Sequence, residues 1–193
     1  PTREPIDPVR YITNRSSGKM GYAVAGAAAA RGAQVTLVSG PADLPVPEGC
    51  ALASVETADE MYEACMVAAP DADIIIAAAA VADYRPSSYS RSKVKKTAGD
   101  LRIELTRTRD IVAELGRIRG ARVIVGFAAE TDDLLANAQA KLASKKLDMI
   151  VANVVGGEHS PFGSDENTVT LLRPGLEPEA LPAMSKLALA DEI

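Results

Sequence analysis

Strand and helix patterns alternate along most of this 193-residue chain. Continuous apolar runs at residues 73–78, 123–127 and 149–152 predict strands that are buried on both faces, as in the centre of a parallel sheet. Helical patterns precede or separate these runs, at residues 19–31 and 132–145. Regular alternation predicts a Rossmann-like α/β fold, in which helices cover both faces of a doubly wound, mostly parallel sheet.

Shorter elements complete this prediction. Thr57, followed three residues later by Glu60, forms a capping-box pattern that predicts the start of a helix over residues 58–69. Gly32 is a typical helix stop. Further strands are predicted at residues 9–13, 34–38 and 51–55.

The length favours a single domain over residues 1–193. Two segments depart from the alternation, and we interpret both as excursions from the sheet. Residues 85–106 are polar and basic and end in an alternating pattern, which predicts a flexible arm and a half-buried strand at residues 101–106. Residues 158–173 are predicted to form a loop followed by a strand.

Composition excludes several classes of protein. The net charge of −5 and the scarcity of aromatic residues, 4% with no Trp, argue against nucleic-acid binding and against a membrane-surface protein. Apolar runs stay well short of the roughly 20 residues of a membrane span. We therefore expect a cytoplasmic protein. The chain begins with Pro1, which leads us to expect a segment of a longer chain or a processed start.

Metal and disulfide chemistry is also constrained. Cys50 and Cys65 are the only cysteines and lack metal-type spacing, so we expect two reduced packing thiols. His159 is the only histidine, which excludes a multi-histidine metal site.

Ligands of open α/β sheets bind beyond the carboxyl ends of the strands. The first such loop contains Ser16, Ser17, Gly18, Lys19 and Gly21, between a predicted strand and a predicted helix. Hydroxyl groups, glycines and unpaired helix N–H groups suit a phosphate. The loop matches neither the P-loop nor the dinucleotide-binding glycine pattern. The alternative interpretation is an ordinary helix start in a tight turn.

Arg10 and Asn14 precede this loop and are separated by four residues. Side chains at even spacing on a strand face the same side, so both residues are candidates to contact one ligand. Asparagine can stabilise an oxyanion, and arginine can bind a carboxylate or a phosphate. The alternative is an arginine at a sheet edge and an asparagine that caps the helix.

Three alanines end the next predicted strand, at Ala77, Ala78 and Ala79. Small residues allow a ligand to lie against the backbone. Asp83 follows them and suits a Mg²⁺ ion or a ribose hydroxyl. The alternative is a strand whose small residues serve packing.

Lysines form the third group of candidates. Lys93 belongs to a basic run on the predicted arm, which suits a triphosphate but is also typical of a solvated loop. Lys141 and Lys145 lie one helical turn apart and could contact one phosphate, although a solvated helix face explains them equally. Phe127 ends a predicted strand, where it either packs against a base or belongs to the core.

Five segments, in order, resemble the signature blocks of bacterial phosphopantothenoylcysteine synthetase. They are DPVRYITN at residues 7–14, SSGKMG at 16–21, AAVADY at 79–84, KVKK at 93–96 and GFAAET at 126–131. The resemblance extends from about Asp7 to the C-terminus. Two positions depart from the family pattern: Arg15 stands where relatives often carry histidine, and RTRDI at residues 107–111 replaces a more usual KNPDI.

The resemblance implies a ligase that joins 4′-phosphopantothenate to L-cysteine through an acyl-cytidylate, with CTP as co-substrate and Mg²⁺ or Mn²⁺ as metal. It implies that Arg10, Asn14 and Lys93 act in catalysis. It also implies that CTP contacts Ala77, Ala78, Ala79, Asp83, Lys93, Arg109, Asp110, Ile111, Val112, Phe127, Lys141 and Lys145. Asp83 is the candidate metal ligand.

The same resemblance implies a homodimer in which the β-rich excursion contributes to the dimer interface. It further implies an N-terminal flavin-dependent decarboxylase domain in the parent chain. Two other functions stay open from the residues alone: an NAD(P)-dependent reductase, because the fold class is shared, and a catalytically silent nucleotide-sensing module. CTP rather than ATP rests on the bacterial resemblance.

Overall fold

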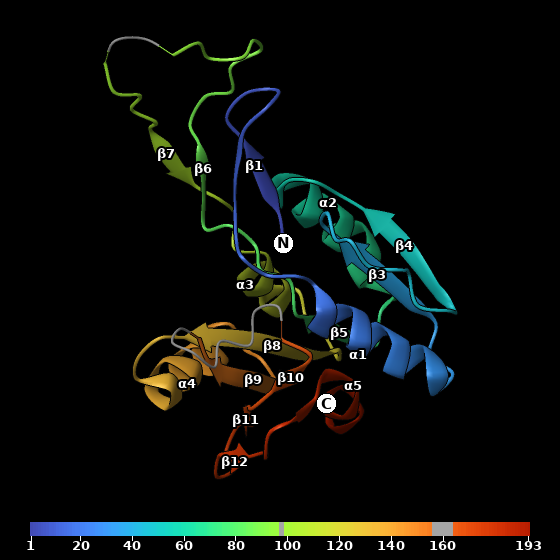
Figure 1. Ribbon diagram of the computed structural model, residues 1–193. Coiled ribbons are helices and arrows are strands. Elements are labelled where there is room, and N and C mark those ends of the chain that lie inside the picture. Colours follow the sequence, from blue (N-terminus) through green and yellow to red (C-terminus); the bar gives the residue numbers. More distant parts are fainter. Residues whose placement is uncertain (97–98, 156–163) are drawn as a thin grey trace.

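A five-stranded sheet forms the centre of the molecule (Figure 1). The computed structural model describes residues 1–96, 99–155 and 164–193. Parallel pairing joins β5 to β8 and β8 to β9, whereas β11 pairs antiparallel with β9 and β12 antiparallel with β11. The strands are β5 (Ile74–Ala77), β8 (Val123–Glu130), β9 (Met149–Val154), β11 (Thr170–Leu172) and β12 (Glu179–Ala180).

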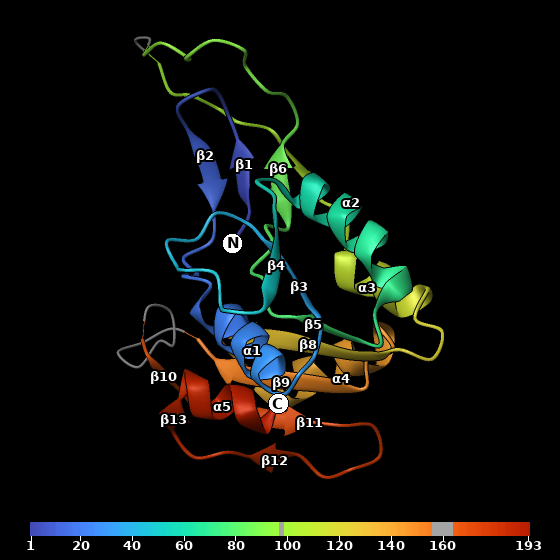
Figure 2. The same cartoon turned by 90° about the vertical axis from the view of Figure 1, so that its right-hand side faces the viewer.

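Helices pack on both faces of this sheet. Figure 2 shows α1 and α5 together on one side of β8 and β9, and the two helices contact each other. On the other side, α3 and α4 pack against the sheet, and α2 contacts α3. The helices are α1 (Lys19–Ala30), α2 (Ala58–Ala68), α3 (Ile111–Arg117), α4 (Leu134–Ser144) and α5 (Lys186–Glu192), with a short 3-10 turn at Ala69–Asp71.

The strand period of two divides the core into two clusters. Ile124 and Ile150 pack with residues of α2, α3 and α4. Their neighbours Val125 and Val151 point to the opposite face, where they pack with Leu189 of α5. Strands β8 and β9 are therefore apolar on both faces, as the continuous runs in the sequence predicted. The predicted α/β class, with a parallel centre between two helix layers, is confirmed.

Smaller sheets surround this centre. Among the pairs in the described residues, β3 and β4 are parallel, and the others are antiparallel. The pairs described are β1 (Arg3–Pro5) with β2 (Tyr11–Thr13), β3 (Val35–Ser39) with β4 (Cys50–Ser54), β6 (Tyr84–Pro86) with β7 (Leu105–Arg107), and β10 (Glu166–Asn167) with β13 (Met184–Ser185).

Two strands differ from the prediction. The strand before α1 does not join the central sheet, because β2 pairs antiparallel with β1 at the N-terminal end of the chain. Strand β5, expected at the centre, lies at one edge of the five-stranded sheet, and its Ile74 is 60% exposed. Apolar runs identify strands, but they do not reveal which neighbour each strand will pair with.

Of the two segments predicted to leave the sheet, one joins the central sheet and the other projects from it. Strand β11, within residues 158–173, does not leave the central sheet but extends it along β9, and residues 158–163, including His159, lie outside the described residues. Residues 85–96 and 99–106 do leave the sheet, and Figures 1 and 2 show them projecting beside the β1–β2 hairpin, whereas residues 97–98 lie outside the described residues. The predicted half-buried strand at residues 101–106 is shorter and exposed, since β7 begins at Leu105.

Short sequence patterns predicted the helix starts more reliably than they predicted which strands pair. Thr57 and Glu60 form the predicted capping box at the start of α2. Cys50 and Cys65 are both free thiols, as expected. Among the described residues, none of the helices is long and apolar enough to cross a membrane.

Candidate functional site

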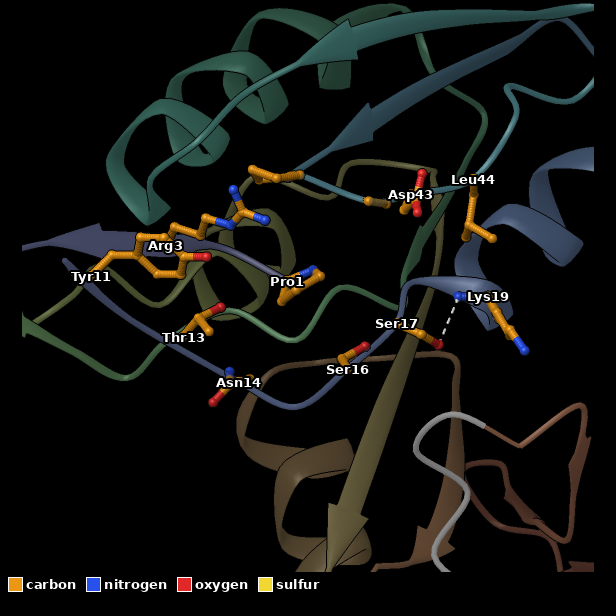
Figure 3. A pocket seen from close by; sticks show the side chains of 12 residues that line it. Pro1, Arg3, Tyr11, Thr13, Asn14, Ser16, Ser17, Lys19, Asp43 and Leu44 are labelled. Atoms are coloured by element: carbon orange, nitrogen blue, oxygen red, sulfur yellow. Dashed lines mark hydrogen bonds between the residues drawn. The ribbon is translucent and has the colours of Figure 1, made fainter. Parts of the chain in front are cut away.

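The start of α1 has a backbone geometry suited to an anion. Gly18 precedes the helix with a φ of 81°, a left-handed conformation that favours glycine. Ser16 Oγ accepts a hydrogen bond from the Gly18 N–H (3.3 Å), and Ser17 Oγ accepts a longer one from the Lys19 N–H (3.5 Å; Figure 3). No side chain of the described residues caps the helix from its N-cap position. The first turn therefore presents backbone N–H groups and a partial positive charge toward the neighbouring space.

Asn14 connects this loop to the end of β5. Its Nδ2 donates a hydrogen bond to the Ala80 carbonyl oxygen (3.1 Å). A Cβ atom added to Gly21 would lie 3.7 Å from the Ala78 Cβ, so the first turn of α1 lies directly against the small residues that follow β5. The structure thus brings Asn14 and the serine-glycine loop, which are neighbours in sequence, against the distant alanine segment.

Two threonines hold the loop after the alanines. Thr2 Oγ1 accepts a hydrogen bond from the Ala82 N–H (3.1 Å), and Thr108 Oγ1 donates one to the Ala82 carbonyl (2.6 Å). The Thr108 N–H also donates to the Asp83 carbonyl (3.0 Å), while Asp83 itself is exposed. Sequence reasoning missed both threonines, because side-chain to backbone contacts over such separations leave no local pattern.

A pocket of about 290 Å³ opens beside this segment (Figure 3). Its wall combines apolar surface with polar side chains and comes from the N-terminal hairpin, the start of α1 and the loop after β3. The Arg3 guanidinium lies 4.7 Å from the centre of the Tyr11 ring, and Lys19 Nζ forms an ion pair with Asp165 (2.6 Å). The lining residues are Pro1, Arg3, Tyr11, Thr13, Asn14, Ser16, Ser17, Lys19, Pro41, Ala42, Asp43 and Leu44.

Arg10 lies at a different place from Asn14. Its guanidinium bonds Asp7, and Nη2 also donates to the Val94 carbonyl (2.8 Å), next to Lys93. Among the described residues that line the pocket, neither Arg10 nor Lys93 appears. Within this chain Arg10 and Asn14 therefore contact different segments, because the backbone leaves strand geometry at Arg10 and at Asn14. That both contact one ligand stays a prediction.

A second polar group lies where α3 begins. Asp110 caps α3 by accepting the Ala113 N–H (3.0 Å), and Lys145 Nζ lies 2.9 Å from its carboxylate. Burial raises the pKa of Asp110, but the hydrogen bonds from Ala113 and Lys145 outweigh it and lower that pKa overall. The structure therefore brings together two predicted nucleotide contacts, Asp110 and Lys145. Ile111 is buried in the core and Val112 packs beside it.

The other predicted contacts are dispersed. Lys141 Nζ pairs with Glu130 Oε1 (2.5 Å) at the end of β8. The Arg109 guanidinium stacks on the Tyr62 ring at 3.7 Å and pairs with Asp59 and Glu63 of α2, so it faces α2.

Phe127 does not end its strand as predicted. Strand β8 continues to Glu130, and Phe127 packs against the core cluster on the α1 and α5 side of the sheet. Ala77 and Ala78 are half-buried, whereas Ala79 is exposed.

Comparison with known proteins identifies the family. The family described as the DNA/pantothenate metabolism flavoprotein C-terminal domain matches residues 1–193. The chain is similar to the coenzyme A biosynthesis bifunctional proteins of Vibrio vulnificus, at 52% identity over 196 residues, and of Bacillus subtilis, at 48% over 194 residues. Both alignments cover 100% of this chain and about half of the relative, 49% and 48% respectively.

A solved structure gives the same result. The crystal structure of the C-terminal domain of a coenzyme A biosynthesis bifunctional protein superposes with a TM-score of 0.83 at 41% identity. That match covers 100% of this chain and 87% of the other. The chain therefore belongs to the family of the DNA/pantothenate metabolism flavoprotein C-terminal domain.

Proposed function

We propose that this chain is a phosphopantothenate–cysteine ligase of coenzyme A biosynthesis that uses CTP. The observation that carries the proposal is the contact of Asn14 and the start of α1 with the alanine segment after β5, beside a pocket that Asn14, Ser16 and Ser17 help to line. An amide donor beside a helix start whose N-cap residue is a glycine suits a substrate that carries both a phosphate and a reacting carbonyl. The names of the relatives, which are coenzyme A biosynthesis proteins, support the same pathway.

The first step activates the carboxylate. An oxygen of the 4′-phosphopantothenate carboxylate attacks the α-phosphorus of CTP, and the bond to pyrophosphate breaks. Both reactants are anionic, so cationic side chains must offset their repulsion. In this proposal Lys93 and Arg10 provide that charge, and the start of α1 binds a phosphate group.

The second step forms the amide. The cysteine amino group attacks the acyl carbon, the resulting tetrahedral oxyanion collapses, CMP leaves, and the nitrogen loses a proton. Asn14 Nδ2, which now donates to the Ala80 carbonyl, is the group that we propose donates to the oxyanion. Asn14 is exposed beside the pocket and can exchange its present partner for substrate.

Magnesium fits this site only as an ion held mainly by the nucleotide. The described residues contain no cluster of three or more Asp, Glu, His or Cys side chains suited to a metal. Mg²⁺ commonly binds one or two carboxylates together with substrate phosphates, and the exposed Asp83 offers one carboxylate. Bound there, the ion would neutralise charge on the triphosphate.

Nucleotide contacts follow from the resemblance. We propose that CTP binds along Ala77–Ala79, Asp83, Asp110, Ile111, Val112, Phe127, Lys141 and Lys145, and that Lys93 joins them. The pairing of Asp110 with Lys145 supports a common surface for part of this set. The orientation of Arg109 toward α2 gives that residue the weakest support. We also propose a homodimer and, in the parent chain, a fused flavin-dependent decarboxylase domain.

Pyrophosphate release tests the function. Purified protein is incubated with Mg²⁺ and either CTP or ATP, with and without 4′-phosphopantothenate and cysteine. We expect pyrophosphate only when CTP and 4′-phosphopantothenate are both present, and phosphopantothenoylcysteine only when cysteine is added. No pyrophosphate under these conditions contradicts the proposal. Equal rates with ATP contradict the nucleotide assignment alone.

The two other functions predict different outcomes. A nucleotide-sensing module binds CTP without releasing pyrophosphate. A nicotinamide-dependent reductase changes NADPH fluorescence on binding, which the ligase does not.

A further inference from the structure

Asp7 connects two segments that the proposed reaction requires. Its side chain is 0% exposed and lies in the turn between β1 and β2. Oδ1 accepts the backbone N–H groups of Val9 and Arg10, both at 2.9 Å. These bonds fix the turn and would be kept by any side chain of the same shape with one acceptor oxygen.

The second oxygen makes different contacts. Asp7 Oδ2 accepts Arg10 Nε (3.1 Å) and Nη2 (2.5 Å) and, from the arm, the Val94 N–H (3.0 Å). Arg10 Nη2 in turn donates to the Val94 carbonyl (2.8 Å). Both backbone groups of Val94 are therefore held by one ion pair, 84 residues away in sequence. We call this arrangement of Asp7, Arg10 and Val94 the arm clamp.

The arm clamp holds the Arg10 guanidinium and the backbone next to Lys93. Arg10 is 42% exposed at its side chain, so burial alone does not fix its guanidinium. Lys93 is exposed and immediately precedes the clamped residue. A second contact, from the Ser90 N–H to the Ile6 carbonyl (3.0 Å), joins the same arm to the same turn without Asp7. Ile6 joins Arg10 and the arm only through backbone groups, whereas the Asp7 side chain bonds both the Arg10 guanidinium and the arm.

Charge makes the arm clamp strong. The hydrogen bond from Arg10 holds the pKa of Asp7 far below its usual range, so the carboxylate stays ionised at neutral pH. Hydrogen bonds between ionised partners are shorter and stronger than neutral ones.

We propose that Asp7 is a positioning residue, which sets Arg10 and the Lys93 segment in one fixed arrangement for the first step of the reaction. The proposal rests on the proposed function, in which Arg10 and Lys93 offset the charge of the carboxylate and the triphosphate. Asp7 itself contacts no substrate in this account.

Asp7→Asn is the direct test. Asparagine keeps the Oδ1 acceptor of the turn but replaces Oδ2 with an NH₂ group, which faces the donors of Arg10 and Val94. We expect amide hydrogen exchange at Val94 to rise about tenfold or more, and exchange at Ser90 to change less. We expect kcat for pyrophosphate release to fall about 10- to 100-fold. Asp7→Glu, which keeps the charge, is expected to recover part of both losses.

Asp148→Asn is the matched control. Asp148 also accepts one backbone N–H, from Ile124 (2.8 Å), and one arginine, through Arg119 Nη2 (2.6 Å), but it lies at the start of β9. Loss of the Asp148 carboxylate is expected to lower the unfolding temperature. Amide exchange at Val94 and kcat are expected to stay within about threefold of the parent protein.

Each outcome decides the proposal. Unchanged exchange at Val94 in Asp7→Asn overturns the arm clamp, and unchanged kcat overturns its role in the reaction. If Asp7→Asn does not fold, Val94→Pro removes the N–H donor while leaving Asp7 and Arg10 intact. Position 94 then has no amide hydrogen to exchange, so kcat for pyrophosphate release is the deciding measurement, and an unchanged kcat overturns the proposal. If the parent protein releases no pyrophosphate, the proposed function fails, while exchange at Val94 still tests the clamp separately.

Discussion

Asn14 makes a structural contact and, in the proposed reaction, also has a chemical role. Its Nδ2 bonds the Ala80 carbonyl in the absence of substrate, which keeps the amide aimed at the end of β5. An amide held in this way loses little freedom when an oxyanion replaces the carbonyl, and such preorganisation is the main source of oxyanion stabilisation.

Asn14→Ala is therefore expected to slow the second step more than the first. Formation of phosphopantothenoylcysteine should fall about 100- to 1,000-fold, as when one oxyanion donor is removed, while single-turnover pyrophosphate release falls less than tenfold. The two products are measured in the same reaction. Gln34→Ala removes an exposed amide elsewhere and should leave both rates unchanged. Equal losses in the two steps would contradict the assignment of Asn14 to the oxyanion.

Helix α1 has a glycine in the left-handed region at each end. Gly18 has a φ of 81° and Gly32 a φ of 85°. A Cβ at Gly18 would lie 3.4 Å from the Ala42 Cβ at the pocket wall, whereas nothing lies within 4 Å of one at Gly32. A residue other than glycine would be strained by the positive φ at either position, but only Gly18 faces the pocket wall.

Comparison of Gly18→Ala with Gly32→Ala separates the effect of backbone strain on stability from any effect on phosphate binding. Each substitution should lower the free energy of unfolding by about 1 kcal/mol, because alanine rarely adopts positive φ. Only Gly18→Ala should also raise KM for 4′-phosphopantothenate, by about tenfold, because the shifted turn moves the N–H groups that bind phosphate. Urea unfolding and steady-state kinetics provide the measurements. A similar KM for both variants would show that the loop does not bind the substrate.

The N-cap residue of α3, Asp110, leads to a prediction of how the stability of the protein depends on pH. The pKa of Asp110 is lowered overall in the folded chain, so the folded state binds its proton less readily than the unfolded state. The stabilisation is present above the ordinary value of 3.8 and is lost as the pH falls through the lowered pKa. Asp110→Asn keeps the cap acceptor but removes the charge.

Urea unfolding at about pH 5.5 and about pH 3 tests this sign. The parent protein should lose more stability between these values than Asp110→Asn does. Lys145→Met, which removes the partner charge, should reduce the loss in the same direction, because Lys145 is one cause of the lowered pKa. An unchanged pH dependence in both variants would contradict the assigned pair.

At the scale of the whole molecule, the projecting arm exposes an apolar row. Leu101, Ile103 and Leu105 alternate along the chain and are 54%, 38% and 49% exposed, and Tyr89 is 52% exposed. The sequence pattern predicts that one face of this segment is buried, yet the chain itself does not bury it. A second copy that covers this row fits both facts and agrees with the dimer that the resemblance implies.

Ile103→Lys should therefore weaken self-association, raising the dissociation constant about 100-fold or more, because a charge would enter an apolar contact. Sedimentation velocity over a range of concentrations measures the change. Leu187→Lys is the control, since Leu187 is 71% exposed on α5, away from the arm. A parent protein that sediments as a monomer at every concentration would contradict the predicted dimer.

Local sequence patterns were sufficient to predict the central strands and the starts of two helices. Continuous apolar runs identified β8 and β9, Thr57 and Glu60 marked the start of α2, and Gly18 lay at a helix start as its sequence context predicted. These features depend on contacts within a few residues, or on burial of both faces of one strand, so the sequence is sufficient for them.

Only the tertiary structure decided which strands pair and which segments the candidate site residues contact. The sequence could not indicate that β2 pairs with β1, that β11 extends the central sheet, or that Asn14 and Arg10 contact different segments. Each of these depends on hydrogen bonds between backbone groups distant in sequence, and every strand offers the same donors and acceptors to any neighbour. The choice among neighbours is made by the packing of the whole chain.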